Sequence, residues 1–113
     1  MTDCLFCRIV ADEIPAAVVG RGDGFLAFED IAPKAPVHLL VIPVRHVDSI
    51  AGVAGLDDGE RAAMLPFIAA VAAEAGLDDS GYRVTTNHGP DARQSVPHLH
   101  WHVMGGTRLS DTM

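Results

Sequence analysis

Residues 95–106 read SVPHLHWHVMGG, a stretch that holds three of the chain's six histidines. One apolar residue separates each of these histidines from the next. Because alternate side chains of a β-strand leave opposite faces, the spacing predicts a strand with all three imidazoles on one face. The three imidazoles are those of His98, His100 and His102. The other face carries three apolar side chains that we expect in the core: Leu99, Trp101 and Val103.

The spacing alone leaves three interpretations of the histidine face. The first is a row of exposed histidines on a solvent-facing strand, although strict alternation of three histidines is unexpected from composition. The second is a hydrolytic zinc site, in which two or three imidazoles hold the ion and a bound water reacts. The third is nucleophilic catalysis by one imidazole, whose neighbours fix its tautomer and stabilise its charge.

The length and charge of the chain restrict its class. The 113 residues predict a single domain over 1–113 with one two-layer core. The net charge of −7 argues against general nucleic-acid binding, which needs a basic surface. A single nucleotide is still compatible with this charge, because acidic proteins do bind small phosphate-bearing ligands.

The N-terminal residues suggest a compartment and a metal. No stretch reaches the roughly 18 apolar residues of a membrane span, and MTDCLFCRIVADE lacks the layout of a signal peptide. We therefore expect no membrane association and a cytoplasmic location, where thiols stay reduced. Cys4 and Cys7 are then metal ligands or redox groups rather than a disulfide. Their C-x-x-C spacing is the usual half of a zinc site, and a thioredoxin-like motif would follow a strand instead.

Apolar spacing and turn residues predict an α+β fold. A short N-terminal helix is expected before Pro15, and a hairpin with a Gly-rich turn is expected over 16–30. Further strands are expected over 37–44, 82–87 and 98–104. Together these elements predict an antiparallel sheet covered by one main helix and the shorter N-terminal one.

The main helix has a predicted start and a predicted buried face. Asp57 and Glu60 stand at capping-box spacing ahead of an alanine-rich segment that runs to Gly76. Pro66 lies inside the segment and predicts either a kink or a late start of the regular helix. The face expected to be buried comprises Leu65, Ile68, Ala72 and Ala75.

Other polar residues make a phosphate ester a coherent ligand. His38 begins a predicted strand, and Asn87 and Ser95 flank the polar loop before the three histidines. Asp30 follows a strand, where its carboxylate would accept hydrogen bonds from a diol. Each residue also has an ordinary structural role open to it, such as a turn former, a loop cap or a surface hydroxyl.

Residues 98–104 match the pattern His-φ-His-φ-His-φ-φ, with φ apolar, and so resemble the histidine triad (HIT) nucleotide-binding proteins. The similarity covers nearly the whole chain and is strongest toward the nucleoside-phosphoramidase branch. Its other matching segments are LAFEDIAPKAPVHLLVIPVRH (26–46), the region of Asn87, QSV (94–96) and Gly105–Gly106. The resemblance implies five antiparallel strands, two helices, a purine nucleotide site, and a homodimer whose two sheets join.

The resemblance also implies residue roles. His100 corresponds to the nucleophile, which attacks the α-phosphorus and forms a nucleotidyl-histidine intermediate that water then hydrolyses. His102 and His38 would orient His100 and neutralise the phosphate, while Ser95 and Asn87 would hydrogen-bond to it. Asp30 would hold the ribose hydroxyls. The residues implied around the base are Leu5, Phe6, Ile9, Phe28 and Ile31.

Two features place the chain within the family, and one departs from the phosphoramidase pattern in a way that bears on substrate preference. The transferase branch has glutamine at the third triad position, so His102 implies a hydrolase. Many bacterial members bind structural zinc, and the positions that match their ligands are Cys4, Cys7, His46 and His98. Where phosphoramidases tend to have glycines before QS, this chain has Ala92 and Arg93.

The sequence therefore predicts a hydrolase of nucleoside 5′-phosphoramidates or aminoacyl-adenylates. One alternative is a dinucleoside polyphosphate hydrolase that uses the same nucleophile. A second is a nucleotide-binding scaffold with residual activity. A three-histidine zinc hydrolase is less favoured, because the two cysteines offer zinc a better site.

Overall fold

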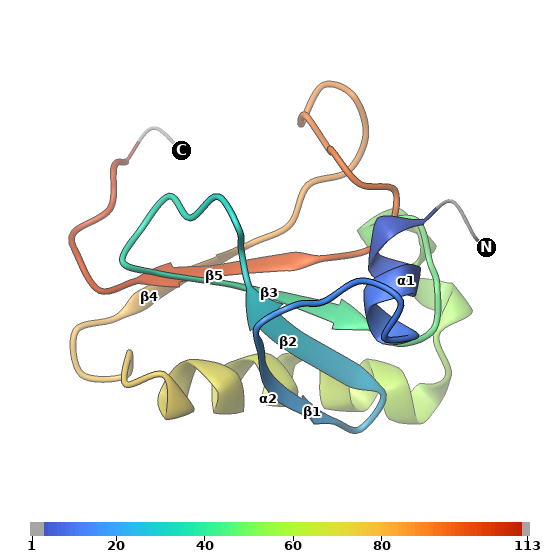
Figure 1. Cartoon of the computed structure of the whole chain (residues 1–113), viewed down its shortest axis with the longest axis horizontal. Coiled ribbons are helices and arrows are strands. Elements are labelled where there is room, and N and C mark those ends of the chain that lie inside the picture. Colours follow the sequence, from blue (N-terminus) through green and yellow to red (C-terminus); the bar gives the residue numbers. More distant parts are fainter. Residues whose placement is uncertain (1–3, 112–113) are drawn as a thin grey trace.

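The computed structural model describes residues 4–111 and confirms the predicted α+β fold. Five antiparallel strands form one sheet in the order β1-β2-β3-β5-β4 (Figure 1). The strands are β1 (Val18–Gly22), β2 (Phe25–Glu29), β3 (Val37–Pro43), β4 (Tyr82–Thr85) and β5 (Trp101–Gly105). The helices are α1 (Leu5–Val10), α2 (Asp58–Glu74) and a 3-10 helix, η1 (Ile50–Gly55).

The two α-helices cover opposite faces of the sheet, and the alternation of β3 explains both packings. Leu39 and Val41 join the core cluster under α2, which also contains Ile68. Leu40 and Ile42 join a second cluster on the other face, against α1. Because β3 is central and buried on both faces, it is apolar at almost every position.

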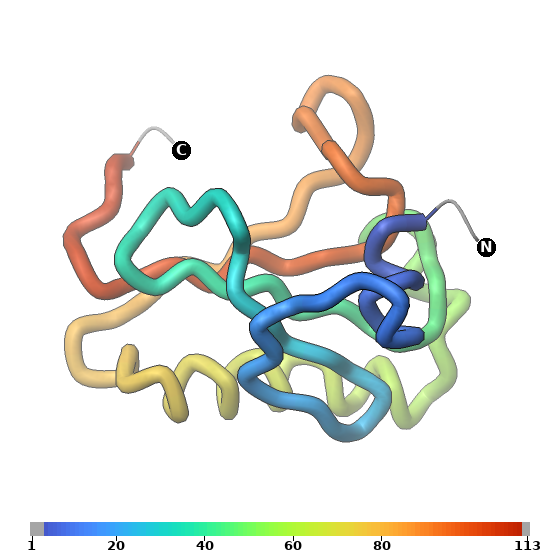
Figure 2. Tube along the Cα trace, viewed as in Figure 1, coloured from blue at the N-terminus to red at the C-terminus, as the bar shows by residue number. Residues whose placement is uncertain are grey.

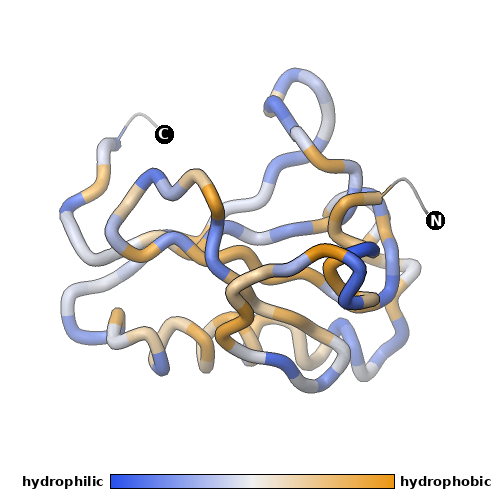
Figure 3. The backbone as a smooth tube through the Cα atoms, in the orientation of Figure 1, coloured by the Kyte–Doolittle hydropathy of each residue, from blue (hydrophilic) through white to orange (hydrophobic). Residues whose placement is uncertain are grey.

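Two long loops rise on the face of the sheet opposite α2. One joins β2 to β3 through residues 30–36, and the other joins β4 to β5 through residues 86–100 (Figure 2). The second loop is mostly hydrophilic, in contrast to the strands that it connects (Figure 3). Both loops therefore border the same face of the sheet as α1.

Helix α2 begins as predicted but buries a different face. The Asp57 carboxylate accepts from the Glu60 amide at 2.7 Å, and the Glu60 carboxylate accepts from the Asp57 amide at 2.8 Å, which forms the capping box. The helix continues through Pro66 without a break. The residues it buries are Met64, Ile68, Val71 and Ala72.

The expectation that Leu65 and Ala75 belong to the buried face is wrong. Leu65 is 58% exposed, and Ala75 is the exposed C-cap residue. One residue of an α-helix corresponds to a rotation of about 100°, so a buried Met64 turns Leu65 toward solvent. Apolar spacing could not tell which face is buried, because the face with Met64 and the face with Leu65 both carry a row of apolar side chains.

The triad strand is shorter than predicted. Its ladder with β3 starts at Trp101, opposite Val41, and not at His98. Pro43 has no amide hydrogen to donate, and the Leu99 amide instead donates to the Val47 carbonyl at 2.8 Å. Residues 98–100 therefore bend away from the ladder toward α1 and the segment after β3.

Among the helices in residues 4–111, none is both long enough and apolar enough to cross a membrane.

Candidate functional site

Five of the six histidines gather on the α1 face of the sheet, and three of them are buried. His98 is 0% exposed, His100 is 4% exposed and His38 is 5% exposed. A row of solvent-facing histidines is therefore excluded for this strand. Four of the five rings fall into two groups, one with the cysteines Cys4 and Cys7 and one with the Asp30 carboxylate, and His100 belongs to neither group.

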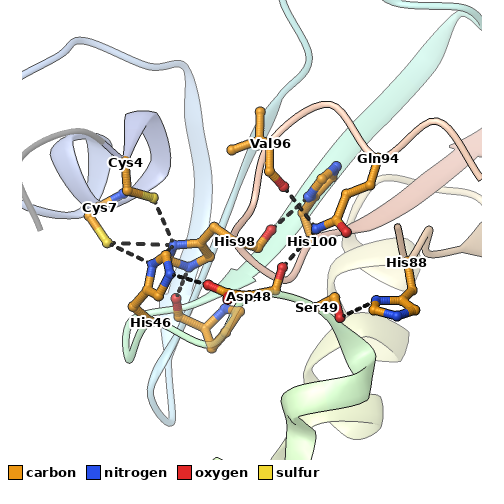
Figure 4. Close-up of polar contacts among 11 residues, drawn as sticks. Cys4, Cys7, His46, Asp48, Ser49, His88, Gln94, Val96, His98 and His100 are labelled. Carbon is orange, nitrogen blue, oxygen red and sulfur yellow. Dashed lines mark hydrogen bonds and ion pairs between the residues drawn. The ribbon is translucent and has the colours of Figure 1, made fainter. Parts of the chain in front are cut away.

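The first group is the cluster that the sequence assigned to a metal. Its members are Cys4, Cys7, His46 and His98, whose ligand atoms all lie within 4.8 Å of one another (Figure 4). Nδ1 of His98 lies 3.3 Å from Cys4 Sγ and 3.6 Å from Cys7 Sγ. Nδ1 of His46 lies 3.3 Å from Cys7 Sγ and 3.1 Å from Nδ1 of His98.

The hydrogen bonds at the far side of each ring leave both Nδ1 atoms without a proton. Nε2 of His98 lies 2.9 Å from the Pro43 carbonyl, and Nε2 of His46 lies 2.8 Å from the Asp48 carboxylate. A carbonyl and a carboxylate only accept, so each Nε2 carries the hydrogen and each neutral ring keeps its Nδ1 lone pair. Two lone pairs 3.1 Å apart repel each other unless a cation lies between them.

The separations agree with tetrahedral coordination. A zinc ion with its usual bond lengths separates two nitrogens by about 3.3 Å and a nitrogen from a sulfur by about 3.6 Å. Burial, a hydrogen bond with Cys4 and the charge of Cys4 raise the pKa of the Cys7 thiol to about 11. A metal ion reverses this effect, because coordination removes the thiol proton. The residues present therefore fit a metal ion.

The orientation of His100 leaves one nitrogen available for chemistry. Its Nδ1 lies 2.8 Å from the backbone carbonyl of His98, which requires the hydrogen on Nδ1. In the neutral form of the ring, Nε2 therefore carries a lone pair. The edge of the Phe6 ring packs against the imidazole with 5.2 Å between centroids, which holds the ring in place.

His38 and His102 form a hydrogen-bonded pair beside His100. Nε2 of His38 lies 2.9 Å from Nδ1 of His102 and 3.4 Å from the Asp30 carboxylate. Burial lowers the pKa of His38, and it lowers the pKa of His102 to about 4, with the neighbouring imidazoles adding to the effect. Both rings are therefore neutral at pH 7.

The ligand atoms of Asp30, His38 and His102 also lie within 4.8 Å of one another, close enough to surround a cation. The position of the hydrogen on His38 argues against a metal ion there. The Lys34 amide donates to Nδ1 of His38 at 3.0 Å, so the hydrogen of neutral His38 lies on Nε2. This Nε2 is the atom that would have to bind the cation. The hydrogen-bonding pattern therefore favours a hydrogen-bond chain over a metal site.

The residues predicted around a base are divided between core and surface. Phe6, Ile9 and Phe28 are buried together on the α1 face, and the Phe6 and Phe28 rings meet edge to face at 5.6 Å. Leu5 is 44% exposed on α1, and Ile31 is 98% exposed just after β2. The Phe6 ring also packs against the His98 and His100 rings, so the buried members of this set adjoin the triad.

Two predicted phosphate ligands have no side-chain partner in the described part of the chain. Asn87 is half-buried and Ser95 is exposed, and neither side chain forms a hydrogen bond with another residue of 4–111. Both lie on the loop between β4 and β5, so their polar groups are free to bind a ligand. Neither side chain forms a hydrogen bond with a histidine in the described part of the chain.

Residues that the sequence analysis missed anchor this loop. The Gln94 amide donates to the Asp48 carbonyl at 2.7 Å and to the Val96 carbonyl at 3.0 Å. The sixth histidine, His88, lies 2.7 Å from the buried Ser49 hydroxyl (Figure 4). The only available signal was the position of Gln94 in QSV, because partners 39 and 46 residues away carry no local pattern.

A cleft of about 380 Å³ opens on the other side of Asp30 and His38, toward α2. It is lined by the loop of residues 30–36 and by Val71, Glu74 and Ala75 at the end of the helix. His100 and His102 do not line it.

The fold and the triad together identify the family. The HIT domain matches residues 11–109, and the chain belongs to the HIT family. Three solved structures resemble it over most of their length. A histidine triad protein from Clostridium difficile is 39% identical with a TM-score of 0.88, covering 98% of this chain and 96% of that one.

The other two structures carry functional descriptions. A HIT family hydrolase from Clostridium thermocellum is 34% identical with a TM-score of 0.83, covering 97% of this chain and 96% of that one. A histidine triad nucleotide-binding protein from Candida albicans is 27% identical with a TM-score of 0.81, covering 96% of this chain and 85% of that one. The chain thus has a hydrolase-like HIT fold.

Proposed function

We propose that this protein hydrolyses nucleoside 5′-phosphoramidates or aminoacyl-adenylates, with His100 as the nucleophile. The observation that carries the proposal is the hydrogen bond from Nδ1 of His100 to the His98 carbonyl at 2.8 Å. In the neutral form of this buried ring it leaves a lone pair on Nε2, beside two further imidazoles. The names of similar HIT structures, a hydrolase and a nucleotide-binding protein, support this class of reaction.

In the first step, Nε2 of His100 forms a bond to the α-phosphorus. The bond from phosphorus to the leaving nitrogen breaks, and its electron pair goes to the amine, which takes a proton from solvent. A neutral imidazole approaches an anionic phosphate without charge repulsion. The positive charge that develops on the ring is stabilised by the His98 carbonyl, which continues to accept from Nδ1.

In the second step, water attacks the phosphorus of the nucleotidyl-histidine. The bond to Nε2 breaks, its electrons return to the ring, and the extra proton of the water returns to solvent. The products are an amine and a nucleoside monophosphate. An aminoacyl-adenylate is a mixed anhydride and reacts in the same way: the bond from phosphorus to the acyl oxygen breaks, and a carboxylate leaves in place of the amine.

Residues around His100 would bind the nucleotide. Asp30 is proposed to accept hydrogen bonds from the ribose hydroxyls, while Asn87 and Ser95 donate to the phosphate. His102 and His38 orient the phosphate and stabilise its charge. The purine would lie against the apolar surface made by Leu5, Phe6, Ile9, Phe28 and Ile31. The dimer that the family resemblance implies is part of the same proposal, and sedimentation of the purified protein tests it.

The metal cluster is proposed to hold one structural zinc ion. Cys4, Cys7, His46 and His98 would hold it, and the ion would supply cross-linking of α1 to the ends of β3 and the triad segment. Because Nδ1 of His98 belongs to this cluster, His98 contributes its carbonyl to the reaction and not its ring.

The test compares two leaving groups on one enzyme. Purified protein is given adenosine 5′-phosphoramidate and diadenosine polyphosphate under the same conditions, and AMP release is measured. We expect faster turnover of the phosphoramidate, and a fall of about 10³-fold or more in His100→Asn. Preference for the polyphosphate would favour the alternative hydrolase, and a variant that retained a tenth of the activity would exclude His100 as the nucleophile.

A further inference from the structure

A backbone amide outside the triad determines which ring nitrogen of His38 carries the hydrogen. Lys34 lies in the loop between β2 and β3, and its N–H donates to Nδ1 of His38 at 3.0 Å. His38 is 5% exposed, so the amide supplies its partner where little water competes. A backbone N–H only donates and does not titrate, so the ring nitrogen that it meets must be unprotonated.

The tautomer of His38 in turn fixes the tautomer of His102. With Nδ1 occupied as an acceptor, neutral His38 carries its hydrogen on Nε2, which lies 2.9 Å from Nδ1 of His102. Nδ1 of His102 must then accept. The hydrogen of neutral His102 is consequently on its own Nε2, the ring atom that neither His38 nor Asp30 engages.

We propose that the Lys34 amide is a positioning group that, through His38, holds His102 as a hydrogen-bond donor toward the phosphate. The inference rests on the function proposed above, in which the phosphate lies at the triad. If the amide were absent, His38 would be free to carry its hydrogen on Nδ1. His102 would then carry its own hydrogen on Nδ1 and present the lone pair of its Nε2 to the ligand. A lone pair in that position repels an anionic phosphate.

The loop is built to keep this amide in place. Pro33 and Pro36 flank Lys34 and Ala35, which restricts the backbone on both sides of the donor. The Asp30 carboxylate accepts from the Ala32 amide at 2.8 Å, and the Asp30 amide donates to the His38 carbonyl at 3.0 Å. The loop is thus tied at its start to the residue that it orients.

The tautomers are tested directly by nitrogen NMR on histidine-labelled protein with its metal bound. We expect a pyridine-like Nδ1 and a pyrrole-like Nε2 for both His38 and His102. In Lys34→Pro, which lacks the N–H, the reversed tautomer of both rings should become populated. Lys34→Ala keeps the N–H and should keep the spectrum, which separates the amide from the ammonium group. A pyrrole-like Nδ1 of His38 in the unaltered protein would overturn the proposal.

Kinetics then test the consequence for phosphate binding and turnover. With adenosine 5′-phosphoramidate, Lys34→Pro should lower kcat roughly 10- to 100-fold, the usual effect of losing a partner that fixes a histidine tautomer. KM should rise by a smaller factor than kcat falls, since the repulsion acts on the bound phosphate but is strongest in the transition state. Ala35→Pro is the matched control, because it adds the same ring to the loop and leaves the Lys34 amide. An equal loss in both variants would contradict the proposal.

A second pair of variants covers failure of Lys34→Pro to fold. Glutamine at position 38 can donate from its side-chain amide to His102 without help from Lys34, whereas leucine cannot. His38→Gln should therefore retain a kcat at least about tenfold above that of His38→Leu. Equal kcat values would reject the relay. If the unaltered protein does not turn over the phosphoramidate, the proposed function fails, while the NMR spectrum still decides the tautomers.

Discussion

At the scale of single residues, the site is defined by where each histidine keeps its hydrogen. Backbone carbonyls orient His98 and His100, a carboxylate orients His46, and a backbone amide orients His38. The backbone partners do not titrate at all. Five similar side chains therefore take different roles, because four of them carry the hydrogen on Nε2 whereas His100 carries it on Nδ1 and keeps its lone pair on Nε2.

Asp30 carries a prediction at this scale. One of its oxygens accepts from the Ala32 amide, and the other lies 3.4 Å from Nε2 of His38, which leaves it capacity to accept from ribose. We expect AMP to bind about tenfold or more tightly than 2′-deoxy-AMP, the effect of one charge-assisted hydrogen bond. Calorimetric titration measures both affinities.

Two variants separate recognition from loop capping. Asp30→Asn should reduce the difference between the two nucleotides, because the charge that strengthens the hydrogen bond is lost. Glu29→Gln, at the exposed end of β2, should leave the difference intact. Equal affinity of the unaltered protein for the two nucleotides would mean that Asp30 only caps its loop.

At the scale of elements, the six-residue helix α1 depends on its cysteines. So short a helix has little stability of its own, and its attachment comes from Phe6, Ile9 and the cluster around His98. The Cys7 amide donates to Cys4 Sγ at 3.3 Å, so the helix also begins at a cluster residue. Loss of the metal ion should therefore disorder helix α1 and the triad segment together.

We expect about one zinc ion per chain in untagged protein, measured by elemental analysis. Cys4→Ser should lower the metal content and the unfolding temperature more than it lowers the turnover of the folded fraction. Arg8→Gln on the same helix is the control, because its ion pair with Glu13 is exposed and spans 3.8 Å. A metal-free protein of equal stability and activity would contradict the zinc assignment.

At the scale of the whole molecule, the buried imidazoles make stability depend on pH. Burial lowers the pKa of His38, His98 and His102 in the folded state, whereas unfolded histidines titrate near 6.5. Below that pH the unfolded chain binds more protons than the folded one. The free energy of unfolding should therefore decrease as the pH falls from about 7 toward 4.

His102→Gln isolates one of these protons. Its pKa of about 4 places its contribution between pH 4 and 6.5, where the slope for one proton is at most about 1.4 kcal/mol per pH unit. Partial exposure makes the measured change smaller. Denaturant unfolding at several pH values should give a shallower slope for the variant. Parallel curves would show that His102 titrates alike in both states.

Local patterns in the sequence were sufficient for the elements and for the identity of the chemical groups. Alternation placed the histidines on one face, C-x-x-C indicated two thiolate ligands, and Asp57 with Glu60 marked the start of α2. These features depend on residues a few positions apart, and local geometry is enough to relate them. The resemblance to the HIT family then connected the distant segments.

Tertiary structure alone decided how those groups are used. It turned Leu65 outward and started the β5 ladder at Trp101 rather than at His98. It also buried His98 and His100, for which exposure was an alternative. It also supplied the partners that set each tautomer, namely Pro43, Asp48 and the Lys34 amide. No sequence spacing encodes these contacts, because a backbone carbonyl or amide exists at every residue and only the fold selects which one a ring meets.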